Sequence, residues 1–89
     1  MPVLKNLKGL SQEQIEFEYI AKPSEIKAIL DKGKAVSAAS DNGAFNIWKD
    51  DEGKIRCASY RYYRELDSVI YSNIKKVEAW ARKWLKEID

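Results

Sequence analysis

The feature that most constrains the fold is an amphipathic segment at residues 72–89, SNIKKVEAWARKWLKEID. At 3.6 residues per turn its apolar residues gather on one stripe: Ile74, Val77, Trp80, Ala81, Trp84, Leu85 and Ile88. Ser72 or Asn73 can cap the first turn of this helix. The two tryptophans on the stripe each contribute about 2–3 kcal/mol when buried. We therefore expect the helix to pack across one face of a second layer.

In residues 34–71, turn signals alternate with strand-forming runs, as in β-hairpins. Residues 41–43 (Asp-Asn-Gly) and 51–53 (Asp-Glu-Gly) are turn signals, and residues 67–68 (Asp-Ser) predict a further turn. Between them lie strand-forming runs, which read AVSAAS, AFNIWKD, KIRCASYRYYREL and VIYS. Short strands joined by tight turns form an antiparallel meander. The second layer is therefore predicted to be an antiparallel sheet.

Residues 11–20 carry two competing patterns. A serine followed three residues later by glutamine matches a capping box, which would begin a helix. Ile15, Phe17 and Tyr19 instead alternate with glutamates, which is the period of a half-buried strand. The aromatic and β-branched side chains favour the strand, and the helix remains the alternative.

A short helix is predicted in residues 24–33. Ser24 can cap its first turn, Glu25 suits the positive end of the helix dipole, and Gly33 provides a left-handed stop. Residues 1–89 are therefore expected to form one α+β domain. Its antiparallel meander of three to five strands is accompanied by a short N-terminal helix and a C-terminal amphipathic helix on one face.

Composition narrows the classes of function. The 89 residues are 45% apolar and 34% charged, with both signs mixed, which is typical of a small soluble domain. The net charge of +2 permits a nucleic-acid partner but does not argue for one. Residues 54–64, however, hold four cations and no acid.

The expected location is cytoplasmic. A single cysteine excludes an internal disulfide, which would be typical of a secreted mini-domain. The first ten residues are too often charged for a signal peptide, and no apolar run is long enough to span a bilayer. We therefore expect no membrane partner.

The residue inventory argues against catalysis. The chain has no histidine, which removes the commonest general base, and its lone Cys57 cannot complete a standard zinc site. Ser24 and Ser72 each begin a Ser-x-x-Lys pattern, but both stand where a helix cap is needed. The acidic run at residues 50–52 is expected to face water at a hairpin tip. We therefore predict no enzymatic activity, no cofactor and no metal, with Cys57 as a packing residue.

The segment IRCASYRYYREL, residues 55–66, concentrates three tyrosines and three arginines. Regular strand alternation would place Arg56, Tyr60, Tyr62 and Arg64 on one face. Because tyrosine and arginine dominate binding hot spots, we predict a partner-binding surface of these residues, with Trp48 on the neighbouring strand as a lower-ranked addition.

An alternative arrangement uses the same tyrosines in the core. Tyr60 and Tyr62 would then pack beneath Trp80 and Trp84, because one strand alone does not reveal which face the helix covers.

Two functions are compatible with such a surface. The first is a protein-binding module that blocks or modulates a larger partner. The alternative is a nucleic-acid binder that stacks bases on tyrosine and clasps phosphate with arginine. The near-neutral total charge favours the protein partner. The chain is expected to be a monomer, or a homodimer through an exposed sheet edge.

Residues 44–88 resemble a family in layout. The run AFNIWKDDEGKIRCASYRYY followed by VIYSNIKKVEAWARKWLKEI, a hairpin, a further strand and a tryptophan-bearing capped helix, is similar to small phage-encoded inhibitors of the anti-CRISPR type. The resemblance implies a phage or mobile-element protein that binds a host protein in the bacterial cytoplasm. The same layout also resembles the arm-type DNA-binding domains of phage integrases, which implies the nucleic-acid alternative.

Overall fold

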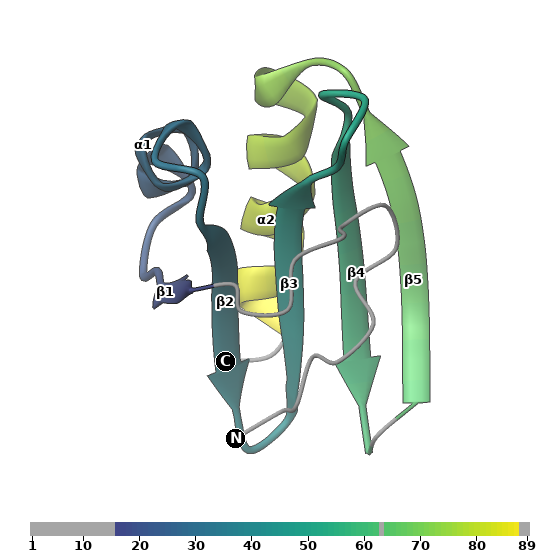
Figure 1. Ribbon diagram of the computed structural model, residues 1–89. Coiled ribbons are helices and arrows are strands. Elements are labelled where there is room, and N and C mark those ends of the chain that lie inside the picture. The colour runs from purple at the N-terminus through teal and green to yellow at the C-terminus, as the bar shows by residue number, and fades with distance from the viewer. Residues whose placement is uncertain (1–15, 63, 88–89) are drawn as a thin grey trace.

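The computed structural model describes residues 16–62 and 64–87 of the chain. These residues form a five-stranded sheet, in the order β1-β2-β3-β4-β5, with a long helix behind it (Figure 1). The elements are β1 (Phe17–Tyr19), the 3₁₀ turn η1 (Pro23–Glu25), α1 (Ile26–Asp31), β2 (Ala35–Ser40), β3 (Gly43–Lys49), β4 (Ile55–Arg61), β5 (Arg64–Tyr71) and α2 (Ile74–Glu87). The predicted α+β fold, with a short first helix and a C-terminal helix, is confirmed.

Strands β2 to β5 form the predicted antiparallel meander, but β1 does not follow it. Phe17 lies opposite Ala35 and Tyr19 opposite Ser37, so β1 runs parallel to β2. A parallel pair needs a crossover connection, and η1 and α1 provide it. The strand reading of residues 11–20 is confirmed for Phe17–Tyr19. Residues 1–15, which include Ser11 of the capping box and Ile15, lie outside the described residues.

The predicted turn at residues 67–68 is wrong. Asp67 and Ser68 lie inside β5, opposite Ser59 and Ala58 of β4. The strand tolerates the charge because Asp67 Oδ2 accepts a hydrogen bond from the indole Nε1 of Trp80 at 3.0 Å. The chain instead reverses between the ends of β4 and β5, where no glycine or asparagine signals a turn.

The helix ends are partly as predicted. The Ser24 cap is wrong, because the Glu25 carboxylate accepts the backbone N–H groups of Lys22 at 2.9 Å and Ala21 at 3.2 Å. At α2 the predicted alternative of Asn73 is confirmed, since its Oδ1 accepts the backbone N–H of Lys75 at 2.8 Å.

The core lies between α2 and one face of the sheet. On the stripe of α2, Trp80 is buried and meets Phe45 of β3 edge to face, with ring centroids 5.4 Å apart. Trp84 follows one turn later, 6.1 Å from Trp80. Cys57 is buried in the same cluster, as predicted for a packing residue. The helix therefore covers one face of the sheet, and the residues predicted to bind a partner must be judged on the rest of the surface.

Candidate partner-binding surface

The structure divides the predicted contact residues into two groups. Trp48 and Arg56 lie opposite each other on β3 and β4, next to the turn that joins these strands. Tyr60 lies farther along β4, about 13 Å from Arg56, and Tyr62 follows the end of that strand. Arg64 is the first residue of β5. The expected placement of Arg56, Tyr60, Tyr62 and Arg64 on one face of one strand is therefore wrong, because the chain reverses after β4.

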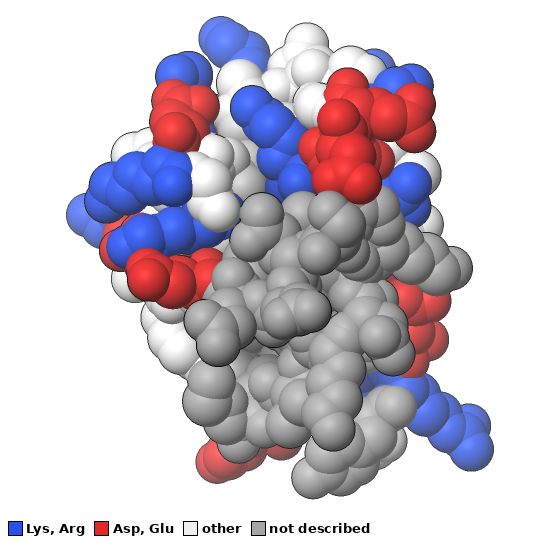
Figure 2. Space-filling model, in the orientation of Figure 1, with Lys and Arg blue, Asp and Glu red and all other residues white. Residues whose placement is uncertain are grey.

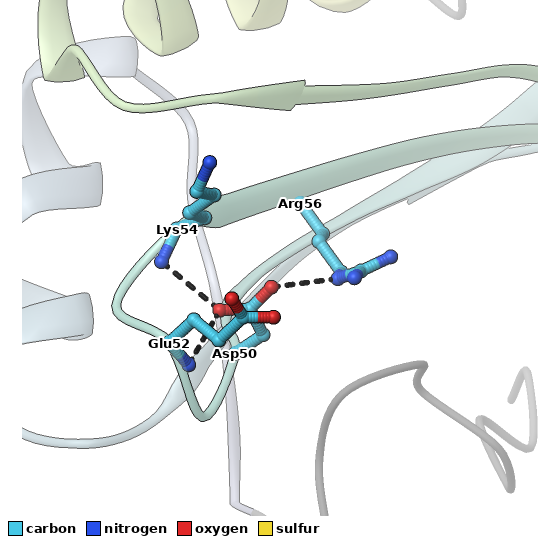
Figure 3. A network of polar contacts seen from close by, with 4 residues as sticks. All are labelled: Asp50, Glu52, Lys54 and Arg56. Carbon is cyan, nitrogen blue, oxygen red and sulfur yellow. Dashed lines mark hydrogen bonds and ion pairs between the residues drawn. The ribbon is translucent and has the colours of Figure 1, made fainter.

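Arg56 is engaged within the β3–β4 turn. Its Nε donates a hydrogen bond of 2.9 Å to Oδ2 of Asp50, a side chain that is only 2% exposed. The other oxygen of Asp50 accepts the backbone N–H groups of Glu52 at 2.9 Å and Lys54 at 3.0 Å (Figure 3). The expectation that this acidic run faces water is therefore wrong for Asp50.

The environment of Asp50 keeps its carboxylate charged. Burial by itself would raise the pKa of Asp50, but the hydrogen bonds from Arg56 and from the backbone of Lys54 and Glu52 outweigh it. The pKa of Asp50 consequently lies below its usual value. Removing one partner of such a pair leaves the other charge uncompensated. Arg56 thus has a structural role in the turn, whatever else it contacts.

Trp48 is also largely internal. It is 5% exposed and packs with Ala35 and Ala58, and Phe17 and Tyr60 lie against this cluster. The cluster is separate from the one that contains α2, so it belongs to the opposite face of the sheet. The alternative in which Tyr60 packs beneath the tryptophans of α2 is therefore wrong.

Tyr60 lies at an irregularity between β4 and β5. Ser59 pairs with Asp67, whereas Tyr60 pairs with Glu65, so Leu66 is an extra residue in β5. Tyr60 is half-buried, and this burial, together with the nearby charge of Glu65, raises the pKa of its hydroxyl. The hydroxyl is therefore a neutral hydrogen-bonding group at physiological pH.

Tyr62 is strongly exposed, unlike Trp48 and Tyr60. Its side chain is 82% exposed, and its backbone has a φ of 52°, in the left-handed region. The other described residues with positive φ are Gly33 and Gly53. A bulky residue in this region costs about 1–2 kcal/mol relative to glycine. Tyr62 is thus held in a strained turn while its ring points away from the core.

The neighbours of Tyr62 brace this end of the sheet. The Nε of Arg61 donates a hydrogen bond of 2.9 Å to the backbone oxygen of Asn42, in the turn between β2 and β3. Both turns lie at the lower end of the sheet in Figure 1. Arg64 is exposed at the start of β5. Tyr62 and Arg64 therefore lie at an end of the sheet where a hydrogen bond joins the two neighbouring turns.

Two apolar residues that the sequence reasoning missed continue this surface along β5. Leu66 is 50% exposed and Ile70 is 51% exposed. They flank Ser68, and Ile70 lies opposite Arg56, on the face away from α2. The alternation of Ser68 and Ile70 with Asp67 and Val69 was a usable signal, but the mistaken turn at residues 67–68 concealed it.

A buried polar pair lies on the same face and was also missed. Ser37 and Asn46 are opposite each other on β2 and β3, and both are buried. Within the described residues, neither the hydroxyl nor the amide atoms have a hydrogen-bond partner. Each unsatisfied group costs about 1–3 kcal/mol. No sequence signal separates such residues from ordinary exposed strand positions.

The described residues offer little for covalent or metal chemistry. Burial raises the pKa of the Cys57 thiol to about 12, with a further contribution from Asp67, so the thiolate is not formed at neutral pH. In residues 16–62 and 64–87, no group of three or more cysteine, aspartate and glutamate side chains could hold a metal ion.

Charges on the face of the molecule shown in Figure 2 are mixed in sign. In Figure 2, blue and red side chains interleave around the margin, without a continuous positive field. Lys34 lies 3.2 Å from Glu16, and Lys32 lies 3.7 Å from Glu18. Arg56 is paired with Asp50, so one cation of the four-cation run of residues 54–64 is compensated.

Comparisons with protein-family models, with curated proteins and with solved structures find no match. Among the helices of the described residues, none combines the length and hydrophobicity needed to cross a membrane. The function must therefore be inferred from the surface itself.

Proposed function

We propose that this chain is a non-catalytic protein-binding module, a small phage or mobile-element protein that inhibits or modulates a larger host protein. The host setting rests on the resemblance of residues 44–88 to anti-CRISPR inhibitors. The contact surface comprises the end of the β4–β5 hairpin and the exposed apolar side chains of β5. Its members are Tyr60, Tyr62, Arg64, Leu66 and Ile70.

The observation that carries the proposal is the geometry of Tyr62. An 82% exposed ring gains almost nothing from the fold, and the left-handed backbone that presents it is strained. Glycine would fit that backbone better, as it does at Gly33 and Gly53. A strained, exposed aromatic residue is therefore explained best by a contact made outside the chain, for which tyrosine is well suited.

The surroundings of Tyr62 suit a binding anchor. The hydrogen bond from Arg61 to Asn42 holds the hairpin against its neighbour, which lowers the entropy lost on binding. Arg64 adds a cation that can make paired hydrogen bonds to a carboxylate. We therefore expect the partner to offer an apolar pocket with an acidic rim.

The nucleic-acid alternative has weaker support. Asp50 compensates the charge of Arg56, and the face of the molecule shown in Figure 2 mixes both signs. A phosphate-binding surface would need several uncompensated cations, and its affinity would fall steeply with salt. Salt dependence therefore separates the two functions.

Capture from a nuclease-treated bacterial lysate tests the proposal, with the wild-type chain, Tyr62→Gly and Tyr19→Ser as matched baits. Tyr62→Gly removes the ring and relieves the strained backbone, so the fold is retained. Tyr19→Ser removes another exposed ring, which is 55% exposed on the far edge of the sheet. We expect a protein retained by the wild type and by Tyr19→Ser, at 50 and 300 mM salt, but lost with Tyr62→Gly. Equal recovery by all three baits, or retention at 50 mM salt that is lost at 300 mM, would contradict the proposal.

A further inference from the structure

The two edges of the sheet are protected very differently. The β1 edge is three residues long, and the ion pairs of Lys34 with Glu16 and of Lys32 with Glu18 surround it. The opposite edge, β5, is eight residues long; its charged residues, Arg64, Glu65 and Asp67, lie in its first half, and its second half, SVIY, has no charge and no proline. Short strands and charged side chains discourage edge pairing, whereas a long strand with exposed apolar residues invites it. Within the described sheet, β5 is therefore the edge open to another strand.

We infer that a second copy of this chain docks on β5 in antiparallel orientation, with the two-fold axis at Ser68. The inference does not rest on the proposed function, but it uses Leu66 and Ile70 of the proposed contact surface, so a second copy and a host protein would compete for these two residues. The irregularity at Leu66 ends the regular part of the strand on one side, and Tyr71 ends it on the other. Ser68 lies midway between Leu66 and Ile70, the exposed apolar residues of β5, which makes it the natural position of the axis.

The side chains of β5 are self-complementary about Ser68. With the axis there, Leu66 lies opposite Ile70 of the second copy, and Ile70 lies opposite Leu66 of the second copy. These are the residues of β5 with large exposed apolar side chains, at 50% and 51% exposure. Directly opposed apolar residues stabilise an antiparallel pair. The dimer would therefore bury Leu66 and Ile70 of both copies.

Neighbouring registers are less favourable. An axis one residue earlier would place the carboxylate of Asp67 opposite the same carboxylate of the second copy. An axis one residue later would place Ile70 opposite Ser68 and leave Leu66 without an apolar partner. In the register centred on Ser68, Asp67 lies opposite Val69, and its Oδ2 already accepts a hydrogen bond from Trp80 within its own chain.

The dimer would join two five-stranded sheets into one continuous ten-stranded sheet. Because the two copies of β5 run in opposite directions, the hairpin ends would point away from each other. The two Tyr62 residues would be about 40 Å apart along the strand direction. Each hairpin end would remain accessible to its own partner molecule.

Two variants that introduce opposite charges test this register. The dimer is measured by sedimentation equilibrium of the full chain, from micromolar to millimolar concentration. We expect the wild type to dimerise, and Leu66→Lys and Ile70→Glu each to raise the dimer Kd at least about tenfold. An equimolar mixture of the two variants should restore the dimer, because one lysine then faces one glutamate and the other apolar pair stays intact. Both positions are already half exposed, so the monomer fold should survive.

Cysteine cross-linking gives a second measurement. In Ser68→Cys, the two cysteines on the axis would have Cα atoms about 4.5–5.5 Å apart, which matches disulfide geometry. Oxidation should produce a covalent dimer quickly in Ser68→Cys and slowly in the control Tyr19→Cys on the opposite edge. A wild type that stays monomeric at millimolar concentration, a mixture that fails to restore the dimer, or equal cross-linking at both positions would overturn the inference.

Discussion

The β3–β4 turn and the β4–β5 turn lie at opposite ends of the same strand, and they use charged and aromatic residues in opposite ways. In the first turn the carboxylate of Asp50 is buried and receives hydrogen bonds from Arg56 and two backbone N–H groups. Gly53 supplies its positive φ of 81°. In the second turn the positive φ belongs to Tyr62, whose ring is exposed.

The comparison distinguishes residues that stabilise the fold, such as Asp50 and Arg56, from a residue that adds little to its stability, Tyr62. Asp50 and Arg56 satisfy each other, so their polarity is explained without a ligand. Tyr62 has the residue type least suited to its backbone and gains almost no burial in return. A sequence reading that weighs only tyrosine and arginine content cannot distinguish the two ends, because both contain such residues.

The largest effect should come from Asp50→Ala. This change leaves the largely buried Arg56 guanidinium without its acceptor and frees two backbone N–H groups. We expect the Tm to fall on the order of 10 °C or more in thermal unfolding monitored by circular dichroism. The adjacent, exposed Asp51→Ala should leave the Tm nearly unchanged. Similar melting of both variants would show that the buried pair does not support the turn.

Acid should weaken the same network. The folded pKa of Asp50 lies below that of an unfolded aspartate, which is about 3.9. The stability it contributes is therefore complete above about pH 4 and is lost as the pH falls through the folded pKa. We expect the Tm difference between the wild type and Asp50→Asn to be largest at pH 7 and to shrink towards pH 2. A difference independent of pH would contradict the charged pair.

Gly53→Ala tests the backbone of the first turn alone. A Cβ at Gly53 would meet no atom within 4 Å, so any loss of stability comes from the left-handed φ. We expect a loss of about 1 kcal/mol in urea unfolding. An unchanged midpoint would show that the turn adopts another conformation in solution.

The smallest effect, with the opposite sign, should come from Tyr62→Gly in the second turn. Glycine removes the left-handed strain but adds conformational entropy to the unfolded chain, so we expect a gain of about 0.5–1 kcal/mol. The same urea titration measures it. A destabilised variant would mean that the Tyr62 ring contributes to the fold, and the argument for a binding anchor would fail.

The fold was predictable where local signals and tertiary packing agree. The apolar stripe of α2 is indicated by residue periodicity. The turns at residues 41–43 and 51–53 are indicated by their glycine and asparagine residues. The last turn was missed because Tyr62 is not a turn former, while Asp67 and Ser68 resemble one. Only the hydrogen bond from Trp80, which lies 13 residues farther along the chain, explains why Asp67 continues a strand.

The site was less predictable because exposure is a property of the whole sheet. Strand alternation left open whether Tyr60 lies in the core beneath α2, and it could not show that Trp48 is buried and Tyr62 exposed. The role of Arg56 depends on Asp50, whose burial no local pattern signals. Leu66 and Ile70 were missed because a turn was wrongly predicted at residues 67–68, inside the strand that carries them.

The neighbour-to-neighbour order of β2 to β5 governs how the domain can assemble. Each of these strands pairs with the one made just before it, so the sheet can grow hairpin by hairpin with short loop closures. The helix that completes the core follows β5 directly and can condense on the finished meander. Strand β1 is different, because its parallel pairing must wait until α1 and β2 exist. Docking of β1 therefore closes a longer loop, at a greater cost in entropy, than forming any hairpin of the meander.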